Sequence, residues 1–103
     1  MLVRIVQLHI QEAHIEHFLK LYAAHQQMIS TNEGCISLNL LQQDGHPDQV
    51  ATLSHWKSEH YLNQYRNSAF FKTLWTQVKP LFASPAKAFS YQIWNEQTES
   101  NGR

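Results

Sequence analysis

The sequence predicts a small α+β domain in which helices cover one face of an antiparallel sheet. Three observations lead to this prediction: four segments with the alternation of strands, two helical regions between them, and an Asp-Gly turn that joins two of the strands. A chain of 103 residues is long enough for one domain with a thin core. We expect residues 1–94 to form that domain and residues 95–103, which have no apolar pattern, to be a flexible tail.

The first 30 residues combine a strand with an amphipathic helix. Residues 2–10, LVRIVQLHI, are β-branched and apolar, and their alternation puts Arg4 and Gln7 on opposite faces of a strand. Residues 12–29 change to a helical period. The apolar side chains on one arc of this helix are Ile15, Phe18, Leu19, Tyr22 and Ile29. Gly34 suits the turn that follows.

Two further strands are joined by a hairpin. Residues 35–42, CISLNLLQ, and residues 49–56, QVATLSHW, flank QDGHPD, in which Asp-Gly and Pro are typical turn residues. Cys35 is the only cysteine, so an internal disulfide is excluded and a reducing compartment is favoured.

The second helical region is predicted to be split. Ser58 is placed to cap a short helix that ends at Arg66, and Ser68 is placed to cap a second helix. Pro80 should kink or end the second helix, and residues 83–87, ASPAK, should turn the chain into a last strand. The element order is then β-α-β-β-α-β, with the second helix in two parts. This is the order of a ferredoxin-like sandwich.

The charge composition bears on partners. Charged residues make up 16% of the chain, against about 25% in ordinary soluble domains. Because the sheet face opposite the helices would be bare, we expect two sheets to meet back to back in a homodimer. Eight basic and eight acidic residues cancel, which argues against nucleic acid or an anionic membrane as partner. Arg4 and Gln7 interrupt the first apolar run, so neither a signal peptide nor a membrane span fits, and a cytoplasmic location is expected.

His25 is the preferred candidate for a catalytic base. It falls on the apolar arc of the first helix and should point toward the sheet, and a neutral imidazole is suited to proton abstraction at neutral pH. The alternative is a histidine at the edge of the core, bonded to a carbonyl. Arg66 is the candidate for stabilising the negative charge that forms if such a base deprotonates a phenol substrate. The alternative is a solvated charge at a helix end.

No metal site or cofactor is predicted. His14 and His17 lie one helical turn apart in EAHIEH, but two ligands do not close a site, and a solvated helix face is the better interpretation. His9 and His55 lie on strands and could face either a pocket or a dimer interface. There is no glycine-rich phosphate loop, nucleophile elbow or zincin motif.

The chain resembles the antibiotic biosynthesis monooxygenase domain family. The resemblance rests on the element order, the length, the NEGC turn, the strand that ends in HW, and SEHYLNQYRNSAFF, and it covers residues 1–94. It implies a dimeric α+β barrel. The family includes cofactor-free oxygenases of quinols and aromatic polyketides, haem-degrading oxygenases and an isomerase of a phosphorylated sugar.

Two branches of the family can be compared at individual positions. Haem-degrading members have an Asn, a Trp and an iron-ligating His where this chain has Gln7, Tyr65 and Trp75. The missing axial ligand disfavours haem degradation. The polyketide-oxidising branch has Asn-x-x-x-Trp followed by Tyr six residues later. Of that pattern this chain keeps only Trp56, as Thr52-x-x-x-Trp56.

These observations predict a homodimeric, cofactor-independent monooxygenase that oxidises a small electron-rich aromatic, of the quinol or anthrone type, with dioxygen. The candidate substrate-binding residues are Gln7, Tyr22, Trp56, Tyr65 and Trp75. Two alternatives remain: a non-catalytic dimeric module that binds a small molecule, and an oxygen-independent isomerase of a small metabolite. A phosphorylated substrate fits less well, because it calls for converging basic side chains and Arg66 is expected to stand largely alone.

Overall fold

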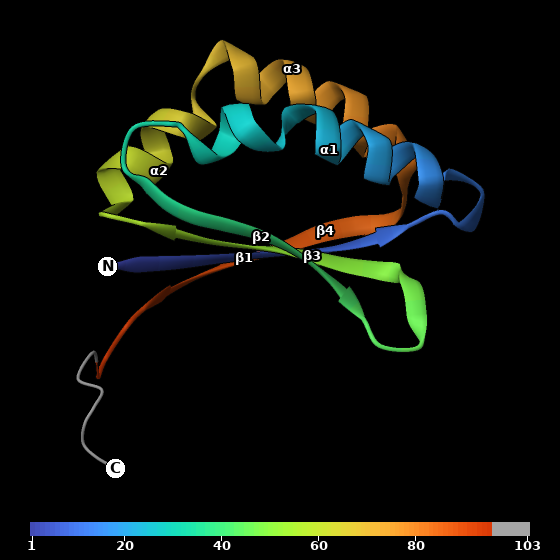
Figure 1. Ribbon diagram of the computed structural model, residues 1–103, viewed down its shortest axis with the longest axis horizontal. Helices are drawn as coiled ribbons and strands as arrows, with labels where there is room; N and C mark the ends of the chain where they lie inside the picture. Colours follow the sequence, from blue (N-terminus) through green and yellow to red (C-terminus); the bar gives the residue numbers. More distant parts are fainter. Residues whose placement is uncertain (96–103) are drawn as a thin grey trace.

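The computed structural model describes residues 1–95 of the chain, and the remainder of the predicted tail lies outside the described residues. The elements are β1 (Leu2–Ile10), η1 (Glu12–His14), α1 (Ile15–Ser30), β2 (Cys35–Gln43), β3 (His46–Trp56), α2 (Glu59–Arg66), α3 (Ala69–Val78), η2 (Lys79–Leu81) and β4 (Phe82–Gln92), where η marks a 3-10 helix (Figure 1). None of the described helices is long and apolar enough to cross a membrane.

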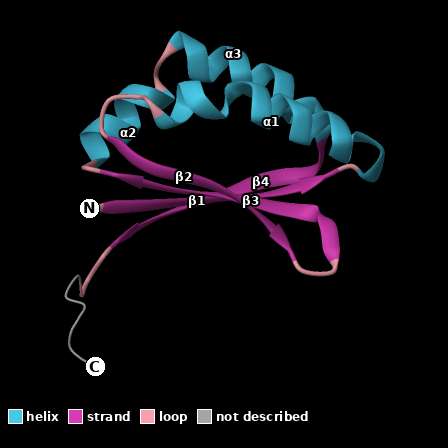
Figure 2. Ribbon diagram, in the orientation of Figure 1, coloured by secondary structure: helices cyan, strands magenta, loops and turns pink. Residues whose placement is uncertain are grey.

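The four strands form one antiparallel sheet in the order β2-β3-β1-β4. Figures 1 and 2 show α1, α2 and α3 on the same side of this sheet, with no helix of residues 1–95 on the other side. We call the uncovered side the helix-free face. The order of the strands and the one-sided helix layer confirm the predicted α+β, ferredoxin-like fold with a split second helix.

The split between α2 and α3 follows from the capping pattern. The backbone N–H of Phe71 donates to Ser68 Oγ at 3.1 Å, so Ser68 caps α3 as predicted. Ser58 lies at the N-cap position of α2, but its side chain makes no capping hydrogen bond, so that prediction is wrong. The first turn of α2 instead has the acidic Glu59 near the positive end of the helix dipole. Pro80 lies in η2, directly after α3 ends.

The last strand begins earlier than the sequence predicts. Residues 83–87 were expected to form a turn, but they belong to β4, which starts at Phe82. Proline is tolerated here because β4 is an edge strand that pairs only with β1, and the register shifts between Gln7 and Ile10 of that partner. The missing N–H of Pro85 therefore costs the sheet few hydrogen bonds.

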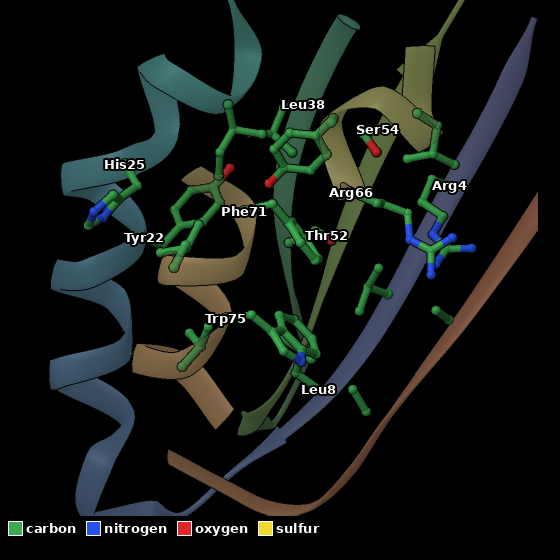
Figure 3. A pocket seen from close by; sticks show the side chains of 18 of the residues that line it. Arg4, Leu8, Tyr22, His25, Leu38, Thr52, Ser54, Arg66, Phe71 and Trp75 are labelled. Carbon is green, nitrogen blue, oxygen red and sulfur yellow. The ribbon is translucent and has the colours of Figure 1, made fainter. Parts of the chain in front are cut away.

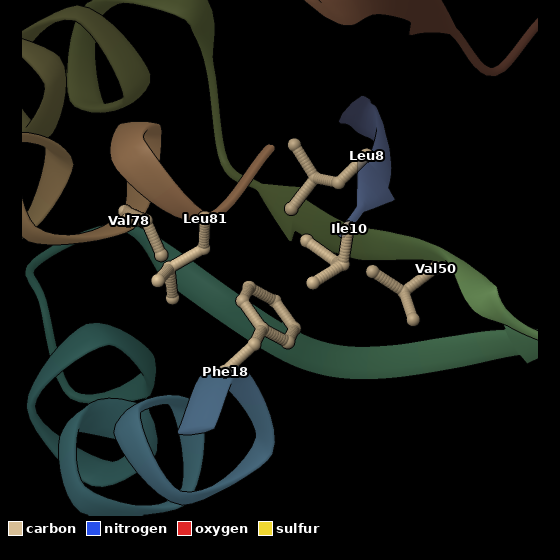
Figure 4. Packing of buried hydrophobic residues seen from close by; sticks show 6 residues of the cluster. All are labelled: Leu8, Ile10, Phe18, Val50, Val78 and Leu81. Carbon is tan, nitrogen blue, oxygen red and sulfur yellow. The ribbon is translucent and has the colours of Figure 1, made fainter. Parts of the chain in front are cut away.

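Two separate clusters of buried apolar side chains hold the helices on the sheet. The larger cluster consists of Leu8, Ile10, Phe18, Val50, Val78 and Leu81 (Figure 4). The smaller cluster consists of Leu2, Trp56 and Leu62. β1 and β3 contribute to both, so the clusters lie at opposite ends of these two paired strands. On α1, Leu21 packs against the larger cluster while Leu19 is exposed, so the buried arc is rotated from the predicted one.

The helix-free face carries both strand histidines. His55 is paired with Val3 in the sheet register, and its Nδ1 lies 2.9 Å from Ser37 Oγ. His9 Nε2 lies 3.0 Å from Asp48 Oδ2. Neither histidine lines the cavity under the helices described below. Both therefore point away from the helix layer.

Both glycines among residues 1–95, Gly34 (83°) and Gly45 (79°), have the positive φ that favours this residue. Gly45 and Asp44 form the two-residue turn of the β2–β3 hairpin, as predicted. Gly34 lies between α1 and β2, where a Cβ atom would overlap the ring of Tyr61. At Gly45 a Cβ atom would meet no neighbour within 4 Å.

This contrast provides a test of the fold. Gly45→Ala should lower the free energy of unfolding by about 1 to 2 kcal/mol, the cost of a left-handed backbone for alanine. Gly34→Ala should cost about 1 to 3 kcal/mol more, because the methyl group also displaces Tyr61. Urea denaturation of both variants measures the difference. Equal losses would show that the contact with Tyr61 does not constrain this turn.

Candidate functional site

A cavity of about 320 Å³ lies between the helices and the sheet. All four strands and all three α-helices contribute to its walls, which are mostly apolar. Figure 3 shows Tyr22 and His25 extending from α1, Phe71 and Trp75 from α3, and Arg4 and Leu8 from β1. Six of the seven residues proposed from the sequence line this cavity. They are Tyr22, His25, Trp56, Tyr65, Arg66 and Trp75.

The cavity is positioned by a change of side-chain size along β1 and β3. Each strand has large apolar side chains facing the helices at both ends, and these belong to the two clusters. Between the ends, β1 presents Arg4 and Val6, and β3 presents Thr52 and Ser54. These side chains do not fill the space beneath the helix layer. The clusters therefore support the layer at its ends and leave the middle open.

A row of stacked aromatic rings forms one wall. The rings of Trp56 and Tyr65 stack with centroids 5.3 Å apart. The ring of Tyr65 meets Phe71 edge to face at 5.0 Å, and Phe71 stacks on Trp75 at 5.6 Å. Each ring also lines the cavity, so the row offers a flat ligand several faces for stacking. Phe71 was not among the site residues proposed from the sequence, because its type alone does not distinguish a core residue from a wall residue.

The indole of Trp56 is fixed by a buried hydrogen bond. Its Nε1–H donates to Ser54 Oγ at 3.0 Å. Trp56 is 1% exposed and Ser54 is 6% exposed, so both partners of this bond are buried. Ser54 was not predicted as a site residue, although its alternation with Thr52 and Trp56 on β3 places it on the inner face.

The phenol groups of the cavity remain protonated over a wide pH range. Burial raises the pKa of Tyr22. Burial raises the pKa of Tyr65 far above its ordinary value, and Cys35 adds to this shift. The buried hydroxyl of Tyr22 has no hydrogen-bond partner among residues 1–95. Because an unpaired buried hydroxyl is costly, Tyr22 is suited to bond a polar atom of a ligand.

His25 has one ring nitrogen available as a base. Its Nδ1 lies 2.8 Å from the carbonyl oxygen of Leu21, one helical turn earlier. A carbonyl can only accept, so Nδ1 carries the hydrogen and Nε2 of the neutral ring is left with its lone pair. The ring centroid is 6.0 Å from that of Phe70. The bond to a carbonyl that the alternative interpretation expected is thus present, and it also fixes the tautomer that a base requires.

Arg66 does not stand alone, and that expectation is wrong. Arg4 lines the same cavity, and its Nη1 donates to Ser90 Oγ at 3.0 Å. Burial and the nearby charge of Arg66 lower the pKa of Arg4. Figure 3 shows the two side chains reaching the same end of the cavity, while His25 lies on the opposite side. The strand alternation already separated Arg4 from Gln7, but it could not show that Arg66 approaches it.

Gln7 is the one proposed site residue that lies elsewhere. It does not line the cavity, and it is exposed on the helix-free face, where it lines a shallow depression with Leu41 and Gln49. The family resemblance suggested a ligand-binding role for this position, whereas the alternation of β1 places its side chain on the other side of the sheet. Within the described part of the chain, no group of three or more His, Cys, Asp or Glu side chains could hold a metal ion.

A double-mutant cycle can measure how much the hydrogen bond between Trp56 and Ser54 contributes to the free energy of unfolding. Ser54→Ala should lower the free energy of unfolding by about 1 to 3 kcal/mol, because it leaves a buried indole N–H without an acceptor. In a Trp56→Phe background, which has no such donor, the same change should cost much less. Chemical denaturation of the two single variants and the double variant gives the coupling energy. A coupling near zero would mean that the bond contributes nothing to the free energy of unfolding.

Comparisons with known proteins agree with this architecture. The chain superposes on a candidate antibiotic biosynthesis monooxygenase from Nitrosomonas europaea with a TM-score of 0.85 and 19% identity, covering 92% of this chain and 100% of that one. It superposes on a candidate antibiotic biosynthesis monooxygenase from Deinococcus radiodurans with a TM-score of 0.86 and 16% identity, covering 99% of this chain and 100% of that one. It superposes on a conserved protein from Methanosarcina mazei Go1 with a TM-score of 0.83 and 22% identity, covering 89% of this chain and 92% of that one.

At these identities the superpositions show a shared fold. No curated protein sequence matches the chain. The sequence model of the antibiotic biosynthesis monooxygenase family, however, matches residues 1–75, which is well over half of the chain. The protein is therefore a member of the antibiotic biosynthesis monooxygenase family.

Proposed function

We propose that this protein is a cofactor-independent monooxygenase that oxidises a small electron-rich aromatic, of the hydroquinone or anthrone type, with dioxygen. Family membership supports a general monooxygenase-like role. The observation that carries the finer proposal is the placement of His25, whose Nε2 has no hydrogen-bond partner among residues 1–95, beside an apolar cavity walled by aromatic rings. A cytoplasmic location belongs to the same proposal, since a free Cys35 suits a reducing compartment.

The proposed reaction begins with proton transfer to His25. A substrate stacked on the aromatic wall loses a proton to Nε2, and the resulting anion gives one electron to dioxygen. The two radicals combine to form a C–O bond, and the peroxide takes up the proton. In an anthrone, loss of water then leaves a C=O group, so that one oxygen atom enters the substrate and the other becomes water. The methylene carbon supplies all four electrons.

The remaining cavity residues favour the anionic form of the substrate. The hydroxyl of Tyr22 can donate to a substrate oxygen, since it has no partner of its own among the described residues. Arg66 and Arg4 make the cavity positive, and low-dielectric walls strengthen this field. Because His25 lies on the opposite side, Arg66 acts on the charge spread over the ring and not on the oxygen next to the base.

The residues that line the cavity also bear on the two alternative functions. An isomerase of a phosphorylated sugar gains support from the converging arginines, but a sugar needs many polar partners and the cavity offers few. A non-catalytic module would bind an aromatic ligand with the same wall and would show saturable binding without oxygen consumption. Catalysed oxygen consumption therefore distinguishes the proposed monooxygenase from both alternatives.

Oxygen uptake tests the proposal directly. Protein stripped of metal, given a panel of hydroquinones and anthrones, should consume oxygen above the autoxidation rate. His25→Ala should lower kcat/KM at least about tenfold, a loss of about 1.4 kcal/mol in transition-state stabilisation. His17→Ala is the matched control, because His17 is exposed on the same helix and does not line the cavity.

The outcomes separate the enzyme from the proposed base. Equal activity of His25→Ala and His17→Ala would exclude His25 as the base but keep the oxygenase. No catalysed uptake with any substrate in the panel would count against the oxygenase. Saturable binding in that case would identify a binding module.

We further propose that the protein acts as a homodimer whose two sheets meet through their helix-free faces. This face includes Ile5, Leu53 and Phe89, which are adjacent in the sheet register, and Tyr91 follows on β4. Phe89 is 40% exposed and Tyr91 is 53% exposed. Large apolar side chains so exposed in a chain with few charges favour burial against a second copy.

The dimer is tested by placing a charge on this face. Leu53→Glu should convert a dimer into a monomer, because two unpaired carboxylates would be buried at the centre of the interface. Thr73→Glu, an exposed position on α3, is the control and should leave the dimer intact. Light scattering coupled to size-exclusion chromatography gives the mass. A monomeric unmodified protein would refute the proposed interface.

A further inference from the structure

Two of the three arginines in the chain, Arg4 and Arg66, line the same end of the cavity. We propose that this pair is a binding subsite for a carboxylate group on an aromatic substrate. The inference rests on the proposed function in that it takes this cavity as the substrate site, and it adds the chemical class of the substrate.

The two guanidinium groups have no counter-ion in the described part of the chain. Among residues 1–95, no carboxylate lies within ion-pair distance of either guanidinium. Within residues 1–95, the only hydrogen bond from the Arg4 side chain goes to the neutral hydroxyl of Ser90. Arg4 is half-buried, and the charge of Arg66 acts against its own. Two like charges held together without a counter-ion are unfavourable, and an anionic group of a ligand would offset that cost.

The donors of the two arginines converge. Arg4 comes from β1 and Arg66 from the last residue of α2, so two different elements direct guanidinium groups to one place (Figure 3). A guanidinium has five N–H donors in a planar fork that matches the two oxygens of a carboxylate. In the described part of the chain, only one donor of Arg4 is occupied, by Ser90. Enough donors remain for an oxyanion to be bound by both side chains.

The two parts of the cavity differ in chemical character. The aromatic wall of Trp56, Tyr65 and Phe71 suits a flat apolar body, whereas the cationic end suits one compact anion. A ligand with both features would be oriented, with its carboxylate at the arginines and the rest of its ring system toward His25. One carboxylate neutralises only one of the two positive charges. The remaining charge still favours the anion formed when His25 takes a proton.

Binding of inert probes tests the subsite without any turnover. 2-Naphthoate and 2-naphthamide have nearly the same shape but differ in charge, and neither is oxidised under the assay conditions. Isothermal titration of the full chain should give at least about tenfold tighter binding of the naphthoate, the size expected for one charge-assisted hydrogen bond. 2-Naphthyl phosphate is included as a third probe, to separate a carboxylate site from a phosphate site.

The arginine variants locate the preference. Arg66→Gln changes an exposed side chain and should keep the fold while lowering the preference for naphthoate about tenfold. Arg4→Gln should do the same, and Arg4→Lys should recover part of the preference, because it restores the charge without the fork. Lys72→Gln removes an exposed positive charge on α3 that does not line the cavity, and it should leave the preference unchanged.

Each outcome supports or overturns the subsite. Equal affinities for naphthoate and naphthamide, or no binding of either, would overturn it. A preference that survives Arg66→Gln and Arg4→Gln would place the anion elsewhere, and tighter binding of the phosphate than of the naphthoate would replace the carboxylate with a phosphate. A clear naphthoate preference without oxygen uptake in the assay above would count against the monooxygenase and leave the subsite standing.

Discussion

The support of the helix layer by two separate hydrophobic clusters is the constraint on which the rest of the structure depends. One cluster is centred on Phe18 and Ile10, and the other on Trp56 and Leu62. A void of about 320 Å³ in a domain of this size loses packing energy, so the two ends must hold the layer without help from its middle. Trp56 both supports the helix layer and lines the cavity, since it belongs to the smaller cluster and is also part of the cavity wall.

The same arrangement determines where polar groups can be placed. At the ends of β1 and β3, a polar side chain facing inward would be packed among apolar neighbours, and burying it without a partner costs several kcal/mol, roughly 2 to 7 depending on the reference state. In the middle of these strands the cavity gives such side chains room, and there the chain has Arg4 and Thr52. Tyr22 and His25 reach the same space from α1. Polar chemistry is thus confined to the region that packing leaves open.

Local periodicity predicted the parts of the fold and site that depend on one element at a time. The helical angle of His25 and the alternation of β1 were sufficient to place side chains on an inner face. The extent of β4 was not predicted, because Pro85 breaks a strand in general and is tolerated only at an edge, which depends on strand order. The approach of Arg66 to Arg4 likewise depends on how α2 lies over β1, and no local pattern contains that information.

The fold alone leaves the substrate open, and the positions that decide it can be named. Proteins that share between 16% and 22% of their residues with this chain superpose on it with TM-scores of 0.83 to 0.86, so the architecture tolerates extensive change. The cluster residues must keep their size and apolar character to hold the helices. Arg4, Thr52 and Arg66 carry no such requirement, because they face the open space and contribute little to packing. Substitution at these positions can therefore change the ligand while the two clusters, and with them the cavity, are preserved.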